Sequence, residues 1–423
     1  GKSLSTVFYA HLLQEALDSP TIVVITDRND LDDQLYGQFA KCKDFLRQDP
    51  IHADKRKLSE QDKERNAHLR KGEKPLIGLM DWLNGRKANG IIFTTMQKFE
   101  ESFECLSEHR NIIVMADEAH RGQYGLKEKV DAKTGAIKVG TARVIRNALP
   151  NATYIGFTGT PISMKDRNTR EVFGDYIDTY DMTQAVEDGA TRPVYYESRI
   201  INLKLDDATL KLIDQEYDLM ANNADPEVIE KSKKELGQME AILGNEKTIN
   251  SLVDDILNHY ENYRENLLTG KAMIVAYSRS IAMKIYERIL HERPSWTEKV
   301  AIVMTGSNKD PEEWNKVIGN KHHRDELAKE FKDNDSPLKI AIVVDMWLTG
   351  FDVPSLATMY VYKPMQGYNL MQAIARVNRV FGDKEGGLII DYVGIAAALK
   401  QAMNEYTARN RKNYGDTDIA KVA

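Results

Sequence analysis

One stretch constrains the fold of this chain more than any other: residues 111–120 read Asn-Ile-Ile-Val-Met-Ala-Asp-Glu-Ala-His. Apolar residues that run into adjacent acids are typical of a buried parallel strand delivering Asp117 and Glu118 to the carboxyl edge of an open α/β sheet, where ligands bind. Mg²⁺ prefers carboxylate oxygen, so Asp117 is the candidate metal ligand and Glu118 the group that polarises an attacking water. The pair predicts phosphoanhydride hydrolysis. The alternative is that the two acids have no catalytic role and only make the end of the strand soluble.

Length and composition limit the class of protein. A chain of 423 residues exceeds one ordinary core, so two or three domains are expected. No apolar run approaches the roughly 18 residues of a membrane span, no signal peptide is visible, and Cys42 and Cys105 are too few for a disulfide framework. These features predict a cytoplasmic protein without a membrane partner. The net charge of −6 argues against a uniformly basic nucleic-acid coat but allows a local basic groove.

The first three residues complete a second motif. Gly1, Lys2 and Ser3 form the last third of the phosphate-binding pattern G-x-x-x-x-G-K-[ST], and a helix-like run over residues 4–17 follows. In the full pattern the lysine reaches the β and γ phosphates and the hydroxyl ligates Mg²⁺. A chance Gly-Lys-Ser is the alternative, and the acids at 117 and 118 favour the nucleotide interpretation. Because the chain opens inside the motif without an initiating Met, we expect a fragment whose upstream part is missing.

Strand and helix signals alternate along two stretches of the chain, separated by a polar, helix-patterned segment. They predict two parallel-sheet α/β lobes in tandem with a helical insertion between them. In the first lobe, strands are expected at 21–26, at 90–95, in the apolar run that leads into Asp117, and in the stretch 154–161. In the second lobe they are expected at 272–277, 301–305, 340–345, 358–362 and 388–391. The expected domains are 1–200, 201–268, 269–395 and a C-terminal helical region beginning at 396.

Other strand ends and turns of the first lobe also carry polar side chains. Thr95, Gln97 and Lys98 are candidates for nucleic-acid contact, with a simple helix cap as the competing interpretation. Thr158 and Thr160 can bond to neighbouring carboxylates and relay the state of the site, although a Gly-Pro turn after a core strand also explains this region. The segments 51–75 and 129–139 predict a solvated helical face and a projecting hairpin.

The second lobe has two further constellations. A turn containing Thr349, Gly350 and Asp352 after a buried strand could contact nucleotide ribose or nucleic-acid backbone, or be a plain loop. Gln372, Arg376 and Arg379 occupy positions i, i+4 and i+7, which predicts one helical face. Two guanidiniums suit a γ-phosphate, whereas surface salt bridging is the ordinary alternative.

Taken in order, Gly-Lys-Ser, Asp-Glu-Ala-His, Thr-Gly-Thr-Pro, Thr-Gly-Phe-Asp and Gln-x-x-x-Arg-x-x-Arg resemble the motifs of helicase superfamily 2. More narrowly, the sequences at 24–34, 94–99, 116–121, 188–193 and 351–354 are similar to those of the R subunit of type I restriction endonucleases. The resemblance implies two RecA-like lobes and an ATP- and Mg²⁺-dependent translocase on double-stranded DNA. Its implied partners are the methyltransferase (M) and specificity (S) subunits. A nuclease domain would precede the motor, so this fragment is not expected to cut DNA.

The resemblance also implies residue roles. Lys2, Ser3 and Asp117 would hold phosphate and Mg²⁺, with Gly1, Gly350 and Asp352 completing the nucleotide contacts. Glu118, Gln372, Arg376 and Arg379 would act in catalysis, His120, Thr158 and Thr160 in coupling, and Thr95, Gln97, Lys98 and Thr349 on DNA. A free-standing DNA or RNA helicase and a non-catalytic DNA-binding scaffold are the rival functions.

Overall fold

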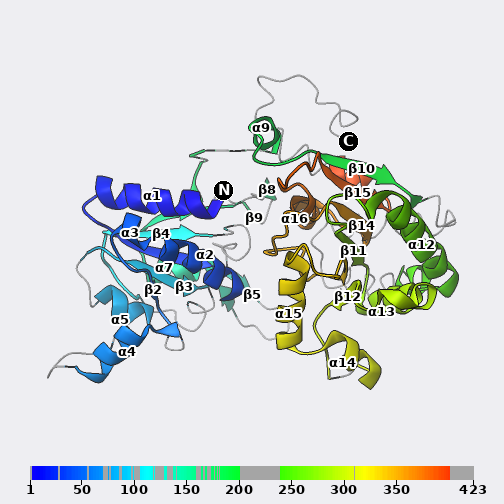
Figure 1. Ribbon diagram of the computed structural model, residues 1–423. Helices are drawn as coiled ribbons and strands as arrows, with labels where there is room; N and C mark the ends of the chain where they lie inside the picture. Colours follow the sequence, from blue (N-terminus) through cyan, green and yellow to red (C-terminus); the bar gives the residue numbers. More distant parts are fainter. Residues whose placement is uncertain are drawn as a thin grey trace. The chain divides into compact units, whose positions relative to one another are not determined.

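The computed structural model divides the chain into two compact units, Gly1–Thr179 and Tyr180–Ala423, each built on its own parallel sheet (Figure 1). The structure describes residues 2–26, 29–54, 57–69, 75, 78–84, 88–96, 99, 105–117, 119, 128–130, 137–139, 141–158, 163–164, 167–168, 173–175, 177–178, 180, 182–200, 239–308 and 310–400. The prediction of two α/β lobes is confirmed.

The first sheet has the strand order β2-β3-β1-β4-β7, and every pairing is parallel. Its strands are β1 (Thr21–Thr26), β2 (Ile51–His52), β3 (Ile91–Thr95), β4 (Ile112–Ala116) and β7 (Thr153–Gly156). Every residue of β1, β3 and β4 is buried. Both faces of these strands are therefore covered, which is why they read as continuous apolar runs in the sequence.

Two apolar clusters lie on opposite faces of this sheet, because successive side chains of a strand point to opposite sides. Ile22 and Val24 pack with residues of α1 and α2, whereas Val23 and Ile25 pack with residues of α5 and α7. The helices of this unit are α1 (Lys2–Ala16), α2 (Asn29–Lys41), α3 (Lys43–Leu46), α4 (Glu60–Ala67), α5 (Leu79–Asn84) and α7 (Thr141–Ala148).

The predictions for 51–75 and 129–139 hold in part. Residues 51–52 form β2 of the sheet, and Ile51, Ala53 and Leu58 are buried in the core, so the first part of 51–75 is not the predicted solvated helical face. Helix α4 buries none of its residues, as expected of a solvated helix. Strands β5 (Glu128–Val130) and β6 (Ile137–Val139) pair antiparallel, which confirms the hairpin. A second short antiparallel pair, β8 (Ser163–Met164) and β9 (Arg167–Asn168), was not predicted.

The second sheet has the order β10-β15-β14-β11-β13-β12 and is also parallel throughout. Its strands are β10 (Val194–Ser198), β11 (Ala272–Ala276), β12 (Val300–Val303), β13 (Ile340–Val343), β14 (Thr358–Tyr362) and β15 (Gly387–Asp391). Around it lie α9 (Met182–Glu187), α12 (Glu246–His259), α13 (Arg279–Glu292), α14 (Glu312–Ile318), α15 (Lys321–Lys332) and α16 (Gly367–Val377), with a π-helical turn at Tyr260–Arg264 and a 3₁₀ turn at Pro294–Trp296.

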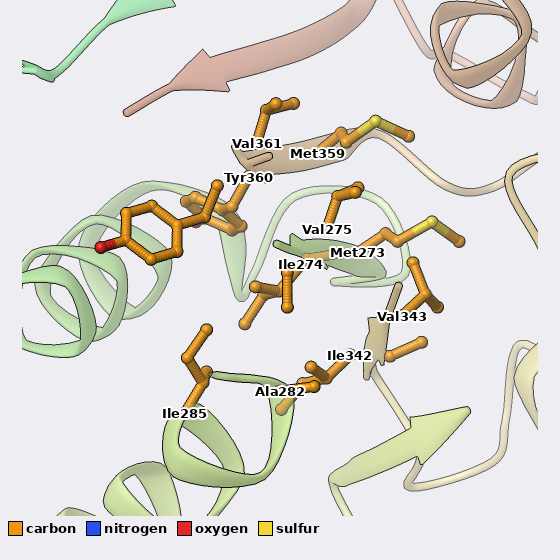
Figure 2. Close-up of a cluster of buried hydrophobic side chains, with 14 of the residues drawn as sticks. Met273, Ile274, Val275, Ala282, Ile285, Ile342, Val343, Met359, Tyr360 and Val361 are labelled. Atoms are coloured by element: carbon orange, nitrogen blue, oxygen red, sulfur yellow. The ribbon is translucent and has the colours of Figure 1, made fainter. Parts of the chain in front are cut away.

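One connected apolar cluster forms the core of this unit. Figure 2 shows Ile274 of β11 and Ile342 of β13 directed toward Ala282 and Ile285 of α13.

Within the described residues, every helix is too short or too polar to cross a lipid bilayer.

The boundary between the units differs from the prediction, which placed residues up to 200 in the first lobe. Strand β10 pairs with β15, so residues 194–198 complete the second sheet. Helix α12 lies within the predicted insertion, yet its Leu252 and Ile256 belong to the core of the second unit. Leu399, in the predicted C-terminal region, packs there too. The remaining predicted segments at 201–238 and 401–423 lie outside the described residues.

Candidate nucleotide site

The carboxyl ends of the central strands of the first sheet meet at one edge. Thr26 of β1 is in register with Thr95 of β3, and Ala116 of β4 is in register with Gly156 of β7. The backbone N–H of Asp117 donates to Ile25 O at 2.9 Å, which extends the ladder by one residue beyond β4. The register of the sheet therefore sets the position of Asp117, as the sequence predicted.

Helix α1 brings the phosphate-binding motif to Asp117. Lys2 is the first residue of this helix, and its Nζ lies 2.8 Å from Asp117 Oδ1, although the two residues are 115 positions apart in the sequence. The Asp117 side chain is only 13% exposed, and that of Lys2 is 30% exposed. Ser3 lies in the same first turn and is half-buried. The start of a helix also offers free N–H groups and a positive dipole end, both of which suit an anion.

This pair has the charges that a magnesium nucleotide would match. A phosphate would give the Lys2 ammonium an anionic partner, and Mg²⁺ would give the Asp117 carboxylate a cationic one. No group of three or more His, Cys, Asp or Glu side chains that could hold a metal occurs in the part of the chain that the structure describes. The Ser3 hydroxyl and the Asp117 carboxylate fit Mg²⁺, which normally takes one or two protein ligands and completes its shell with water and phosphate oxygens.

The neighbouring strand ends place two more predicted residues. Thr158 is half-buried beyond β7, where Phe157 N donates to Ala116 O at 2.8 Å and Ala119 N donates to Phe157 O at 3.0 Å. Thr95 is 8% exposed, so its side chain presents little surface to a ligand in this conformation. Six predicted site residues lie outside the described residues: Gly1, Gln97, Lys98, Glu118, His120 and Thr160.

In the second unit, Thr349, Gly350 and Asp352 lie in the connection between β13 and β14, as predicted. This segment has a defined shape. Gly350 has φ +73°, and Trp347 also has a left-handed backbone with φ +67°. The Trp347 ring stacks on that of Phe351 with centroids 4.0 Å apart. A non-glycine residue with positive φ is held there only by its surroundings, and this stack is one such contact.

Two arginines attach to this connection from α16 and the residues after it. Arg376 donates to Phe351 O at 2.5 Å and to Gln372 O at 3.1 Å, and Arg379 Nε lies 3.1 Å from Asp352 Oδ1. The structure thus brings together the predicted arginines and the predicted loop of the second lobe.

The predicted helical face of Gln372, Arg376 and Arg379 is wrong in one respect. Helix α16 ends at Val377, so Gln372 and Arg376 are one turn apart on the helix while Arg379 lies beyond it. The cause is Asn378, which is 5% exposed, leaves the helical conformation with ψ 8°, and accepts a hydrogen bond from Arg192 N through its carbonyl oxygen. The chain leaves the helix where it joins the segment that leads into β10.

The sequence does not reveal the buried charged residues of this unit, among them Asp391 and Lys384. Asp391 ends β15, and its carboxylate accepts hydrogen bonds from the Tyr196 hydroxyl and from the backbone N–H groups of Val393, Gly394 and Ile395. Burial raises the pKa of Asp391 from its ordinary value, while these hydrogen bonds oppose the rise. Lys384 is 1% exposed and donates to backbone carbonyls. The local sequence Gly-Asp-Lys-Glu-Gly is typical of an exposed turn, so it does not indicate that Lys384 is buried.

Comparison with protein families gives two matches on this chain. A model described as SWI2/SNF2 ATPase matches residues 1–230, which include the Lys2–Asp117 site. A model described as type I restriction enzyme subunit R domain 3 matches residues 303–394, which include Asp352, Arg376 and Arg379.

Among curated relatives, the HindI endonuclease subunit, a type I restriction enzyme of Haemophilus influenzae, is 42% identical over 438 residues, covering 100% of this chain and 39% of the relative. The putative MjaIXP endonuclease subunit of Methanocaldococcus jannaschii is 41% identical, covering 100% of this chain and 37% of the relative. The chain therefore spans about two fifths of the length of these relatives.

Solved structures match at the level of the fold. A fragment of a putative HsdR subunit from Vibrio vulnificus aligns with a TM-score of 0.50 at 13% identity, over 96% of this chain and 66% of that one. The ATP-dependent Type ISP restriction-modification enzyme LlaBIII, solved bound to DNA, aligns with a TM-score of 0.52 at 13% identity, over 92% of this chain and 25% of that one. At this level of sequence identity, both matches show a likeness of fold alone.

Proposed function

Since this chain belongs to the SWI2/SNF2 ATPase family and is homologous over its whole length to endonuclease subunits of type I restriction enzymes, we propose that it is the ATP-driven motor of such a subunit. The proposed activity is movement along double-stranded DNA, driven by ATP hydrolysis with Mg²⁺. The observation that carries the proposal is the 2.8 Å contact between Lys2 and Asp117. It joins a phosphate-binding cation and a metal-binding acid at one sheet edge.

The proposed chemistry divides among few residues. Lys2 would bind the β and γ phosphates, and Ser3 and Asp117 would hold Mg²⁺. When bound, the metal ion would supply positive charge next to the phosphates. Glu118 orients the attacking water, a role worth roughly two to four decades in rate. We assign to Arg376 and Arg379 the stabilisation of transition-state charge, for which an arginine contributes on the order of three to five decades.

The proposed partners follow from the relatives. Type I restriction endonuclease subunits suggest assembly with M and S subunits in the cytoplasm, and the fold neighbour solved with DNA supports DNA as the substrate. Because the chain spans about two fifths of its relatives, we assign it only the motor part of the parent's activity. The S subunit would then select the DNA sequence.

The function is tested by ATP hydrolysis of the full-length parent subunit, alone and with its M and S partners, on duplex and on single-stranded DNA. Stimulation by duplex DNA only with the partners present is expected. Movement along DNA is checked by displacement of a third-strand oligonucleotide from an intact duplex. Strong stimulation by single strands without partners would instead identify a free-standing helicase. DNA binding without any ATP hydrolysis would identify a scaffold.

The catalytic assignment within this experiment is tested by Glu118→Gln. We expect ATP binding to persist and kcat to fall by roughly two to four decades, because the amide cannot accept a proton from water. Glu108→Gln is the matched control, since Glu108 is an exposed acid that precedes the same strand. Normal turnover by Glu118→Gln would remove the assignment.

A further inference from the structure

Lys384 is buried in a way that surface lysines are not. It is 1% exposed, although lysine is almost never fully buried without partners. Its Nζ donates to Leu356 O at 2.6 Å and to Pro354 O at 3.1 Å. Its own N–H closes a turn onto Phe381 O at 2.9 Å. The ammonium therefore links the turn before β15 to the connection between β13 and β14.

Each of these two segments also carries one member of an ion pair, and both members are proposed to act at the nucleotide. Asp352 lies two positions before Pro354, and Arg379 lies five positions before Lys384. The Arg379 Nε and Asp352 Oδ1 atoms are 3.1 Å apart. The Lys384 contacts and the Asp352–Arg379 pair thus join the same two segments at two places.

The ion pair cannot hold this geometry by itself. The side chains of Arg379 and Asp352 are 40% and 46% exposed, and exposed pairs contribute little because water and salt screen them. A buried ammonium bonded to two carbonyls is far less free to move, and removing it would leave both oxygens without their donor. The pKa of Lys384 also reflects how close its ammonium lies to Arg379 and Asp352. Burial, Arg379 and Arg264 lower the pKa of Lys384 to about 8, while Asp352 opposes this shift.

We propose that Lys384 is a positioning residue, whose ammonium clamps the Pro354 and Leu356 carbonyls and so holds Asp352 and Arg379 at the separation that ATP turnover requires. Lys384 itself touches no reacting atom. This inference rests on the proposed function.

The same unit offers a matched control. Lys271 is also 1% exposed, and its Nζ donates to Phe331 O, Asp333 O and Asn334 Oδ1. Burial is the main reason that its pKa is also lowered to about 8. Lys271 precedes β11, and its ammonium holds the end of α15. This ammonium contacts neither Asp352 nor Arg379, and it reaches the connection between β13 and β14 only indirectly, through Asn334, whose Oδ1 also accepts a hydrogen bond from Ser355.

The test compares Lys384→Met with Lys271→Met in the full-length parent subunit. Both substitutions should lower the unfolding temperature. At a temperature where both variants are folded, Lys384→Met should reduce kcat of DNA-stimulated ATP hydrolysis at least tenfold with a smaller change in KM, because the loss falls on the transition state. Lys271→Met should stay within about twofold of wild type. In an Asp352→Asn background, Lys384→Met should cost much less than in wild type, since interacting residues are not additive.

Equal losses of kcat in the two lysine variants would overturn the proposal, because they would indicate general destabilisation. Unchanged kcat in folded Lys384→Met would overturn it as well. Should that variant not fold, Lys384→Gln takes its place under the same criteria, since its amide keeps two donor hydrogens without the charge. A wild-type subunit without ATPase activity would instead refute the proposed function, so the two failures are distinguishable.

Discussion

The two lobes share a parallel-sheet architecture but position their candidate functional residues differently. In the first lobe, Asp117 and Thr158 follow strands whose register fixes them at one sheet edge. In the second lobe, Asp352 and Arg379 lie in connections between elements, and side-chain contacts hold them. Backbone pairing thus places the first set, whereas buried polar and aromatic side chains place the second. The second arrangement depends on residues far apart in the sequence.

The cores differ in a related way. The first sheet separates two apolar clusters, while the second lobe has one connected cluster bordered by buried polar contacts. His259 Nδ1 lies 2.9 Å from the Tyr360 hydroxyl, and the Tyr392 hydroxyl donates to Asp255 Oδ2 at 2.6 Å. Buried groups that can ionise make the stability of the second lobe depend on pH.

The largest expected effect is an acid sensitivity of the second lobe due to His259. Burial, followed by the positive charge of Arg199, lowers the pKa of His259 from 6.5 to about 4. The unfolded state therefore takes up a proton between pH 6.5 and 4 that the folded state refuses, so this stability is complete above pH 6.5 and is lost as the pH falls toward 4. This lowering of the pKa corresponds to roughly 3 to 4 kcal/mol of unfolding free energy when it is fully expressed.

Urea unfolding at pH 7 and pH 4.5 measures the free energy of unfolding of the second lobe and so tests this prediction. Of the four tryptophans, only Trp82 lies in the first lobe, so Trp82→Phe leaves a fluorescence signal from the second. His259→Asn keeps a polar group near the Tyr360 hydroxyl but cannot titrate, and it should reduce the loss of stability between the two pH values. The same loss in both proteins would show that His259 is not its source.

Removing the N-cap side chain of a helix should have a smaller effect on the free energy of unfolding. The size of this effect should depend on whether the helix packs against a core. Asn320 caps α15 through its side chain, and this helix buries Leu327 and Phe331. Asn320→Ala should lower the free energy of unfolding of the second lobe by about 1 kcal/mol. Ser59 caps α4, which buries no residue, so Ser59→Ala should loosen α4 alone. Urea unfolding measures the global cost and hydrogen exchange the local one. An equal loss of global unfolding free energy in both variants would contradict this difference between α15 and α4.

Much of the fold could be predicted from the sequence because the central strands are short apolar runs. Residues 21–26 and 358–362 were predicted with the bounds that β1 and β14 have, and the other central strands lie within three residues of prediction. The contact between Lys2 and Asp117 was also accessible, since each belongs to a motif whose chemistry requires the other. These features depend on local patterns, which a single sequence displays.

The features that escaped prediction depend on distant partners. Strand β10, with sequence Val-Tyr-Tyr-Glu-Ser, pairs with β15 almost 200 positions later, and no local pattern assigns it to the second lobe. The end of α16 at Val377 depends on the carbonyl of Asn378 bonding to Arg192. The burial of Lys384 depends on carbonyls about 30 positions earlier. Such tertiary contacts override helix periodicity and the usual exposure of lysine.

The central claim is that Lys2 and Asp117 form a magnesium nucleotide site, and the most direct measurement is ATP binding to the full-length parent subunit with and without Mg²⁺. In wild type, Mg²⁺ should tighten binding at least tenfold. In Asp117→Asn that gain should disappear, while binding of metal-free ATP should persist because Lys2 no longer pairs with a carboxylate. An Asp117→Asn variant in which Mg²⁺ tightens ATP binding as much as in wild type would contradict the claim.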